Sequence, residues 1–524
     1  MTHLTASQEF IAFILPPAAA LAGMRMGRWV LGEKFQSEFG LGFRLAFGLA
    51  VGMLVFSQAV LLCAILGLAA AAALAWLIFI WGGVELVLLA MKLPQSLKNI
   101  KFLSGHLWLL LLLPLFYYWW VFGRLSTLEG TLEFDANAFW VFRAKILYLE
   151  QGQNFINTIR TPNLAYAHMD YPWLNGGLYA LDYGAEGGVD EFVNKVWPFW
   201  IMVALSASVL SLAKIWSRPS PLPIAVVTIV SFLPGNLQFI RWEGGTVPLV
   251  FYVSMVALLL FNAIWRKNSF FLAAALPLLA GCAMTKFEGV IYGVLWLGLL
   301  APFGWKYKWF ADKTIWKSAL AGFVCLLPFA IYRLLKPDTY ELDNWWKAYA
   351  TAWPTVVPFF FKALVLYIPG RFFQDAFYHF KLSDTSHLNW DGKSLGLGDF
   401  VNDQLAVLPW LLVVLLVFSF WKKRQMWPLL MLSAVMFGMM AFFTVVLTGV
   451  AYTESDVPNT IDYQSLFVDW NGSIMIGRYC FPFFIGWFFG VALLWFPDGT
   501  ATRQIPQPEK KVAAPLAPKP KKRQ

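Results

Sequence analysis

The feature that most constrains this chain is a series of long apolar runs separated by short polar breaks. Runs such as Leu107 to Phe122, Leu411 to Trp421 and Leu429 to Val450 approach or exceed the roughly 18 to 20 apolar residues that span a hydrocarbon core. Only 13% of the residues are charged and 59% are hydrophobic, whereas a soluble domain carries nearer ~25% charged residues. A water-soluble core cannot bury that much apolar surface, so the sequence predicts an all-α polytopic membrane protein.

One helix per apolar run gives about thirteen transmembrane helices, with ends uncertain by roughly 2 to 4 residues. They are expected near residues 9–24, 43–64, 67–91, 103–124, 192–213, 221–238, 246–265, 269–285, 288–304, 317–335, 404–421, 426–449 and 475–496. Aromatic residues gather near the ends of these runs, as is typical of residues at the two membrane interfaces.

Lys and Arg residues set the expected orientation, because short cytoplasmic loops retain positive charge. With thirteen crossings, the basic loops all fall on one side: Arg25 to Arg44, Lys92 to Lys101, Lys214 to Arg218, Arg266 and Lys267, Lys306 to Lys317, and Lys422 to Arg424. The Pro-rich and Lys-rich tail 497–524 falls on the same side and is expected to be disordered. The net charge of +10 is therefore interpreted as membrane topology, and no nucleic-acid partner is expected.

Three longer polar segments fall on the opposite side and hold most of the acidic residues: 125–191, 336–403 and 450–474. The stretch Phe139 to Leu149 has helical spacing and is expected to lie along the membrane interface. Residues 355–380 are apolar but broken by Pro369-Gly370. We interpret them as interfacial, because a full crossing would invert every later basic loop; a spanning segment is the open alternative.

The first candidate site follows the expected fourth helix. Asp135 stands at the mouth of that helix, ahead of an aromatic stretch that carries Arg143 and Lys145. Such a carboxylate could deprotonate an acceptor hydroxyl beside a bound anion. The local sequence by itself favours a simpler role, in which Asp135 caps the helix that follows by accepting from its free amides.

Other candidates lie on the same side of the membrane. His168, Asp170 and Tyr171 could bind sugar hydroxyls, although a single His near an interface is more often simply solvated. Arg241 with Glu243 and Lys286 with Glu288 lie in two short turns. Ionisable residues at membrane depth are costly and are functional candidates, with structural pairing or snorkelling as the alternative.

Four motifs carry a family resemblance: FDANAFWVFRAK at 134–145, HMDYPWL at 168–174, TKFEG at 285–289 and GRYCFPFF at 477–484. Their order and their shared side resemble the bacterial GT-C glycosyltransferases. These polytopic enzymes use polyprenyl-phosphate sugars and include the aminoarabinose and protein mannosyl transferases. The resemblance runs from roughly Gly105 to Phe496.

The resemblance implies a GT-C-like fold with interfacial helices in the large outer loops. Residues 103–496 would form the catalytic module, and residues 1–102 would be extra N-terminal transmembrane helices. It also implies a multi-pass protein of the bacterial inner (plasma) membrane, with its active site facing the periplasm or exterior.

Site roles follow from the resemblance in the same way. It implies that Asp135 is the catalytic base or its metal partner, and that Lys286 and Arg478 bind the donor phosphate; we add Arg241 to that set. The expected substrate-binding residues are Asn137, Arg143, Lys145, His168, Asp170, Tyr171, Glu243, Glu288 and Tyr479. Many members have a paired acidic motif, whereas Asp135 is followed by Ala136-Asn137, which leaves dependence on a divalent metal open. The four cysteines have no CxxC spacing and are expected to be packing residues.

The expected reaction is inverting transfer of a sugar from a polyprenyl-phosphate donor to a glycan, lipid or protein acceptor. The alternatives are an en bloc oligosaccharide ligase and a lipid or solute transporter or flippase. A transport route needs polar groups near mid-membrane, whereas the candidate residues here cluster on one side. Membrane lipid is an expected partner in every case.

Overall fold

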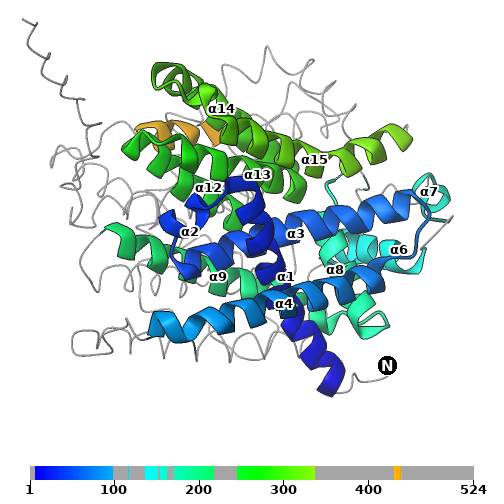
Figure 1. Ribbon diagram of the computed structural model, residues 1–524. Helices are drawn as coiled ribbons and strands as arrows, with labels where there is room; N and C mark the ends of the chain where they lie inside the picture. Colours follow the sequence, from blue (N-terminus) through cyan, green and yellow to red (C-terminus); the bar gives the residue numbers. More distant parts are fainter. Residues whose placement is uncertain are drawn as a thin grey trace, which may run out of the picture.

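The computed structural model describes residues 6–97, 136–150, 154–161, 171–216 and 245–336, together with 116, 169, 430–436 and 438–439. These residues form helices and their connections, with no strand among them (Figure 1). Within this described part, six helices are long and apolar enough to cross a membrane. They are α1 (Ala6–Leu31), α3 (Leu41–Ile65), α4 (Ala71–Leu97), α12 (Thr246–Arg266), α14 (Phe287–Lys306) and α15 (Lys313–Leu335).

For the described residues, the prediction of a helical protein with several membrane-spanning helices is therefore confirmed. Two further helices pack among the long ones, α9 (Val196–Trp216) and the shorter α13 (Ser269–Thr285). The count of thirteen stays a prediction, because much of the chain is not described. The expected helices 221–238, 404–421 and 475–496 lie outside the described residues, 103–124 is described only at residue 116, and 426–449 is described only in part.

Shorter elements connect the long helices. The stretch expected to be helical at Phe139 to Leu149 is so: a π-helical turn η2 (Ala136–Val141) continues into α6 (Phe142–Leu149). The remaining short elements are α2 (Lys34–Glu38), α7 (Asn154–Ile159), α8 (Leu174–Glu186), η4 (Phe192–Lys195) and η5 (Trp309–Ala311). The sequence does not predict α8, which lies in the polar segment 125–191.

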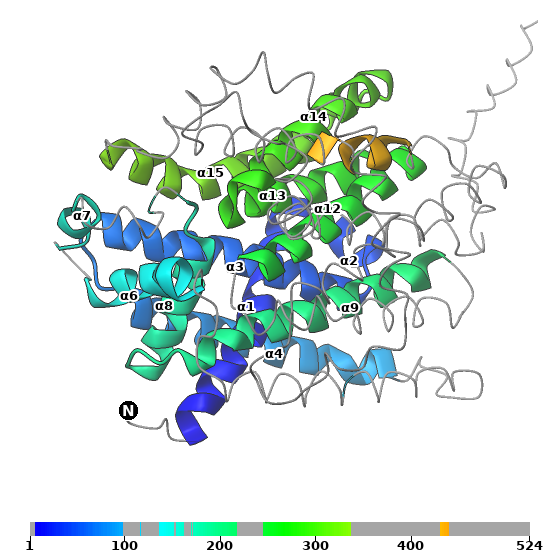
Figure 2. The ribbon, with the colours of Figure 1, turned by 180° about the vertical axis from the view of Figure 1, so that it is seen from behind.

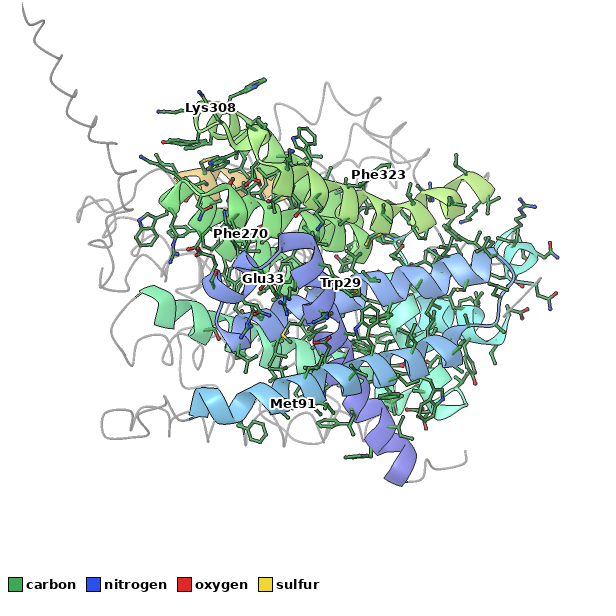
Figure 3. All side chains as sticks on the ribbon, viewed as in Figure 1. Trp29, Glu33, Met91, Phe270, Lys308 and Phe323 are labelled. Atoms are coloured by element: carbon green, nitrogen blue, oxygen red, sulfur yellow. The ribbon has the colours of Figure 1, made fainter. Side chains whose placement is uncertain are left out.

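The described basic loops gather at one end of the helix bundle. Arg266, the last residue of α12, lies 3.9 Å from the Glu38 carboxylate, and Ser269 donates a 2.7 Å hydrogen bond to Asp312 ahead of α15. Figure 3 labels Glu33, Phe270 and Lys308 toward this end. This is the grouping that the basic residues of the sequence predict.

The segments α6, α7 and α8 lie at the opposite end (Figures 1 and 2). There the C-terminal end of α15 contacts the chain that precedes α8: the Tyr332 hydroxyl donates to the Met169 carbonyl at 2.8 Å. Arg160, just after α7, donates to the Leu335 carbonyl at 3.1 Å.

A single hydrophobic core joins α1 and α3 to α8, α9, α12 and α13. At the centre lies α12, whose apolar window is entirely buried. The outer helices α4, α14 and α15 instead turn apolar side chains outward, including Ile80 at 65%, Val294 at 61% and Leu320 at 62% exposure. Water would make that surface costly, whereas lipid tails are as apolar as the side chains themselves.

Small residues let α1 and α3 cross closely. A β-carbon on Gly48 would lie 2.1 Å from the Ala20 carbonyl oxygen, and one on Gly52 would lie 2.4 Å from that of Ala19. The spacing of four residues puts both glycines on one helix face, which is the small-xxx-small packing that drives helix association in membranes. The helices α1 and α3 therefore pack tightly against each other.

A proline pair interrupts α1 in the middle of its length. Pro17 has no N–H group, so the Phe13 carbonyl loses its usual partner within the helix. The Trp200 indole N–H of α9 donates to that carbonyl at 2.9 Å. The bond therefore replaces a missing backbone bond and ties α9 to α1.

Replacing Trp200 by phenylalanine should lower the free energy of unfolding by about 1 kcal/mol, because the Phe13 carbonyl would lose that partner. Thermal unfolding in detergent measures this. The matched control is Trp76→Phe, the same change at a 54% exposed position of α4. Equal losses in the two variants would contradict a role for the hydrogen bond.

Polar residues on α8 explain why its sequence resembles a loop. It packs on α3, α4 and α6, and all of its residues are buried. Asp182 accepts a 2.9 Å hydrogen bond from the Trp197 indole. Burial raises the pKa of Asp182 well above its usual range, the nearby Glu186 charge raises it further, and the Trp197 bond only partly opposes this.

The raised pKa of Asp182 predicts how its contribution to stability changes with pH. Above the unfolded-state value near ~3.9, the folded chain holds a proton that the unfolded chain has released, so this contribution is lost as pH rises toward the folded pKa. Asp182→Asn should therefore stabilise the protein relative to wild type increasingly as the pH rises above about 4 and until the folded-state pKa is reached, by up to about 1.4 kcal/mol per pH unit. Parallel curves of unfolding midpoint against pH would contradict this.

Candidate functional site

Residues from three distant segments meet at Gly245, which precedes α12. A β-carbon built on Gly245 would lie 3.0 Å from Asn175 Nδ2, 3.1 Å from Trp140 Cζ2 and 3.2 Å from Lys286 Cε. Trp140 belongs to η2, Asn175 to α8, and Lys286 to the turn between α13 and α14. All lie at the end of the bundle opposite the described basic loops.

Substituting Gly245 by alanine should therefore impair function more than folding. The added methyl group would push apart the ends of three side chains without meeting any backbone atom at those distances, so the chain can fold around it while the site loses its geometry. Each neighbour must move by a few tenths of an ångström, and because a full 1 Å misplacement can cost on the order of 10²-fold in rate, we expect a smaller loss than that. Gly83→Ala is the control, because a β-carbon there meets nothing within 4 Å; equal activity of the two variants would contradict this account.

Lys286 lies where two helices begin. Its backbone is extended between the last residue of α13 and the first of α14, and its Nζ donates to Oγ1 of Thr246, the first residue of α12, at 3.4 Å. Free amide groups at helix N-termini carry partial positive charge. Two such ends and the ammonium group of a lysine that is only 8% exposed as a residue together make a place that favours an anion.

Glu288 is the acidic residue in the first turn of α14. Its side chain is buried, and its Oε2 atom has no hydrogen-bond partner within the described part of the chain. A carboxylate near a helix N-terminus is electrostatically favourable. Glu288 therefore offers a free acceptor near Lys286 in the same turn.

Arg143 holds the aromatic wall of the site in place. Its guanidinium lies 4.4 Å from the centre of the Trp140 ring and donates to the backbone carbonyls of Tyr171 at 3.2 Å and Pro172 at 3.0 Å. The Tyr171 ring in turn lies 5.2 Å from that of Phe287, next to Lys286. Arg143 and Tyr171, two of the residues predicted to bind substrate, thus hold the aromatic side chains of the site in place. Their contact with a ligand stays a prediction.

Two of the other predicted site residues lie in the described part of the chain. Lys145 forms an ion pair with Glu191, and Asn137 lies in η2. Seven lie outside the described residues: Asp135, His168, Asp170, Arg241, Glu243, Arg478 and Tyr479. Asp135 directly precedes the first residue of η2, the element that contributes Trp140 to the site.

The sequence does not single out Trp140, Asn175, Gly245 or Thr246 as site residues. Asn175 directly follows the HMDYPWL motif and is 1% exposed. Neither of its amide atoms has a hydrogen-bond partner in the described part of the chain. The sequence signal for Asn175 is its place as a polar residue at the start of a short apolar stretch.

No group of three or more His, Cys, Asp or Glu side chains that could hold a metal occurs among the described residues. Cys63, Cys282 and Cys325 are free thiols. Comparison with known proteins finds no matching protein-family model, no matching curated protein and no matching solved structure.

Proposed function

We propose that this chain is a GT-C-type membrane glycosyltransferase that moves a sugar from a polyprenyl phosphate to a glycan, lipid or protein acceptor. The reaction would take place at the periplasmic or exterior face of a bacterial inner membrane. One observation carries the proposal: three of the four motifs that suggest the family lie side by side. FDANAFWVFRAK and TKFEG meet at Gly245 through Trp140 and Lys286. HMDYPWL adjoins both, because the Tyr171 ring lies 6.1 Å from that of Trp140 and 5.2 Å from that of Phe287.

In the proposed mechanism the donor phosphate binds against Lys286, where α12 and α14 begin. The acceptor hydroxyl attacks the anomeric carbon as the bond from that carbon to the phosphate oxygen breaks, and Asp135 takes the hydroxyl proton. Negative charge then develops on the leaving phosphate. Donors already fixed in place stabilise such charge most effectively, and Arg241 and Arg478 are predicted to add to them.

A single displacement of this kind inverts the anomeric centre. The residues described at the site supply a cation, an amide and a carboxylate. The extracytoplasmic position of the site is supported by its distance from the basic loops, which remain on the cytoplasmic side under the positive-inside rule.

Purified protein in lipid nanodiscs tests this proposal. It is incubated with polyprenyl-phosphate sugars and a lipid or glycan acceptor extract, and the release of sugar-free polyprenyl phosphate is followed by mass spectrometry. We expect release that requires Lys286 and is unaffected by Lys306→Met at the far end of α14, about 30 Å away along the helix. Translocation of the lipid across a vesicle membrane with no loss of its sugar would instead identify a transporter.

A further inference from the structure

The side chain of Asn175 is the least explained polar group of the site. It is almost completely buried, and both Oδ1 and Nδ2 have no hydrogen-bond partner in the part of the chain that the structure describes. Burying an unpaired amide costs free energy. Asn175 Nδ2 faces Gly245 at the same point as Trp140 and Lys286, so a ligand held there would be within its reach.

The two free atoms of this amide restrict the chemistry of the ligand. A phosphate oxygen accepts hydrogen bonds and could satisfy Nδ2 while leaving Oδ1 unpaired, and an ammonium group could do only the reverse. A hydroxyl group both donates and accepts, so neighbouring hydroxyls of one ligand could satisfy both atoms. The adjoining Trp140 ring supplies apolar surface, which together with a few polar groups is typical of small-molecule sites.

We propose that Asn175 recognises the sugar of the donor: its Oδ1 accepts from one hydroxyl and its Nδ2 donates to a neighbouring oxygen of the same ring. Lys286 beside it would hold the phosphate to which that sugar is attached. This inference rests on the proposed function for the identity of the ligand. It goes further by assigning sugar recognition to one residue outside the motifs.

The test compares undecaprenyl phosphate carrying mannose, glucose or aminoarabinose with the same lipid carrying no sugar. Binding to the full-length protein in nanodiscs is measured for wild type and for Asn175→Leu, which is of similar size and cannot form hydrogen bonds. We expect wild type to prefer at least one sugar-bearing lipid and Asn175→Leu to lose about tenfold or more of that preference. Affinity for the sugar-free lipid should stay the same, and the unfolding temperature without ligand should be equal or higher.

Asn262→Leu is the matched control. Asn262 is a buried amide of α12 whose Nδ2 donates to the Leu258 carbonyl at 2.7 Å, about 24 Å along the helix from Thr246. This variant should keep the sugar preference. If Asn175→Leu does not fold, Asn175→Ser, which keeps one small hydroxyl, should show an intermediate preference.

Two results would overturn the inference: no preference for any sugar in wild type, or an unchanged preference in Asn175→Leu with a lower unfolding temperature. The latter would make Asn175 a structural amide, held for example by a buried water. Failure of the proposed function is a separate outcome, since a preference that depends on Asn175 without any sugar release means binding without transfer.

Discussion

Replacing Lys286 by methionine should weaken binding of a polyprenyl-phosphate sugar by roughly 10²-fold or more. Lys286 is 8% exposed, so a phosphate bound there would pair with an ammonium group largely removed from water. Truncating one partner of such a pair typically costs about 2 to 5 kcal/mol, and each 1.4 kcal/mol corresponds to about tenfold in affinity. Methionine keeps the length and apolar volume of the side chain, which limits the change to the charge and its hydrogen bonds.

Donor affinity and thermal unfolding must be measured together for this variant. Lys286→Arg should retain part of the affinity, because the charge remains while the larger head group must fit beside Gly245. Lys306→Met should change neither quantity. If Lys286→Met leaves donor affinity intact but lowers stability by several kcal/mol, Lys286 is instead a structural counterion for a carboxylate such as Glu288.

Asp135→Asn should slow sugar transfer by roughly 10² to 10⁴-fold, the range typical of a lost general base, while donor affinity and unfolding temperature change little. Asparagine caps a helix about as well as aspartate does, so this variant separates proton transfer from helix capping. Asp135→Ala removes both functions and should lose roughly 1 kcal/mol of stability in addition.

Single-turnover transfer and thermal unfolding of the two variants decide between the roles. Full activity in Asp135→Asn with a loss of stability only in Asp135→Ala would show that Asp135 is a cap. The residue directly precedes η2, whose Trp140 lies beside Gly245 at the candidate site.

The long helices were predictable because a helix that spans the bilayer needs a run of about 20 apolar residues. The runs expected at 43–64, 246–265 and 317–335 correspond to α3, α12 and α15 within a few residues. The short helix α8 was not predictable in this way. Its glycines, Asn175 and Asp182 give the composition of a loop, and only packing on α3, α4 and α6 makes this segment a buried helix.

The sequence indicated which segments contribute to the candidate site but not which side chains touch one another. Unusual charges near apolar runs pointed to Lys286 and Glu288, since ionisable residues are costly at membrane depth. Nothing in the sequence shows that Gly245 and Asn175 lie beside Lys286. Arg143 illustrates the same limit: its charge suggested a ligand contact, whereas its bonds to the Tyr171 and Pro172 carbonyls depend on how two segments pack.

The location of the donor phosphate tests the central claim most directly. A cryo-electron microscopy structure of the full-length protein with a polyprenyl-phosphate sugar would show it. We expect phosphate oxygens within hydrogen-bonding distance of Lys286 Nζ, where α12 and α14 begin, and the sugar beside Asn175. A phosphate bound at the opposite, basic end of the bundle, with Lys286 paired to Glu288, would contradict the account.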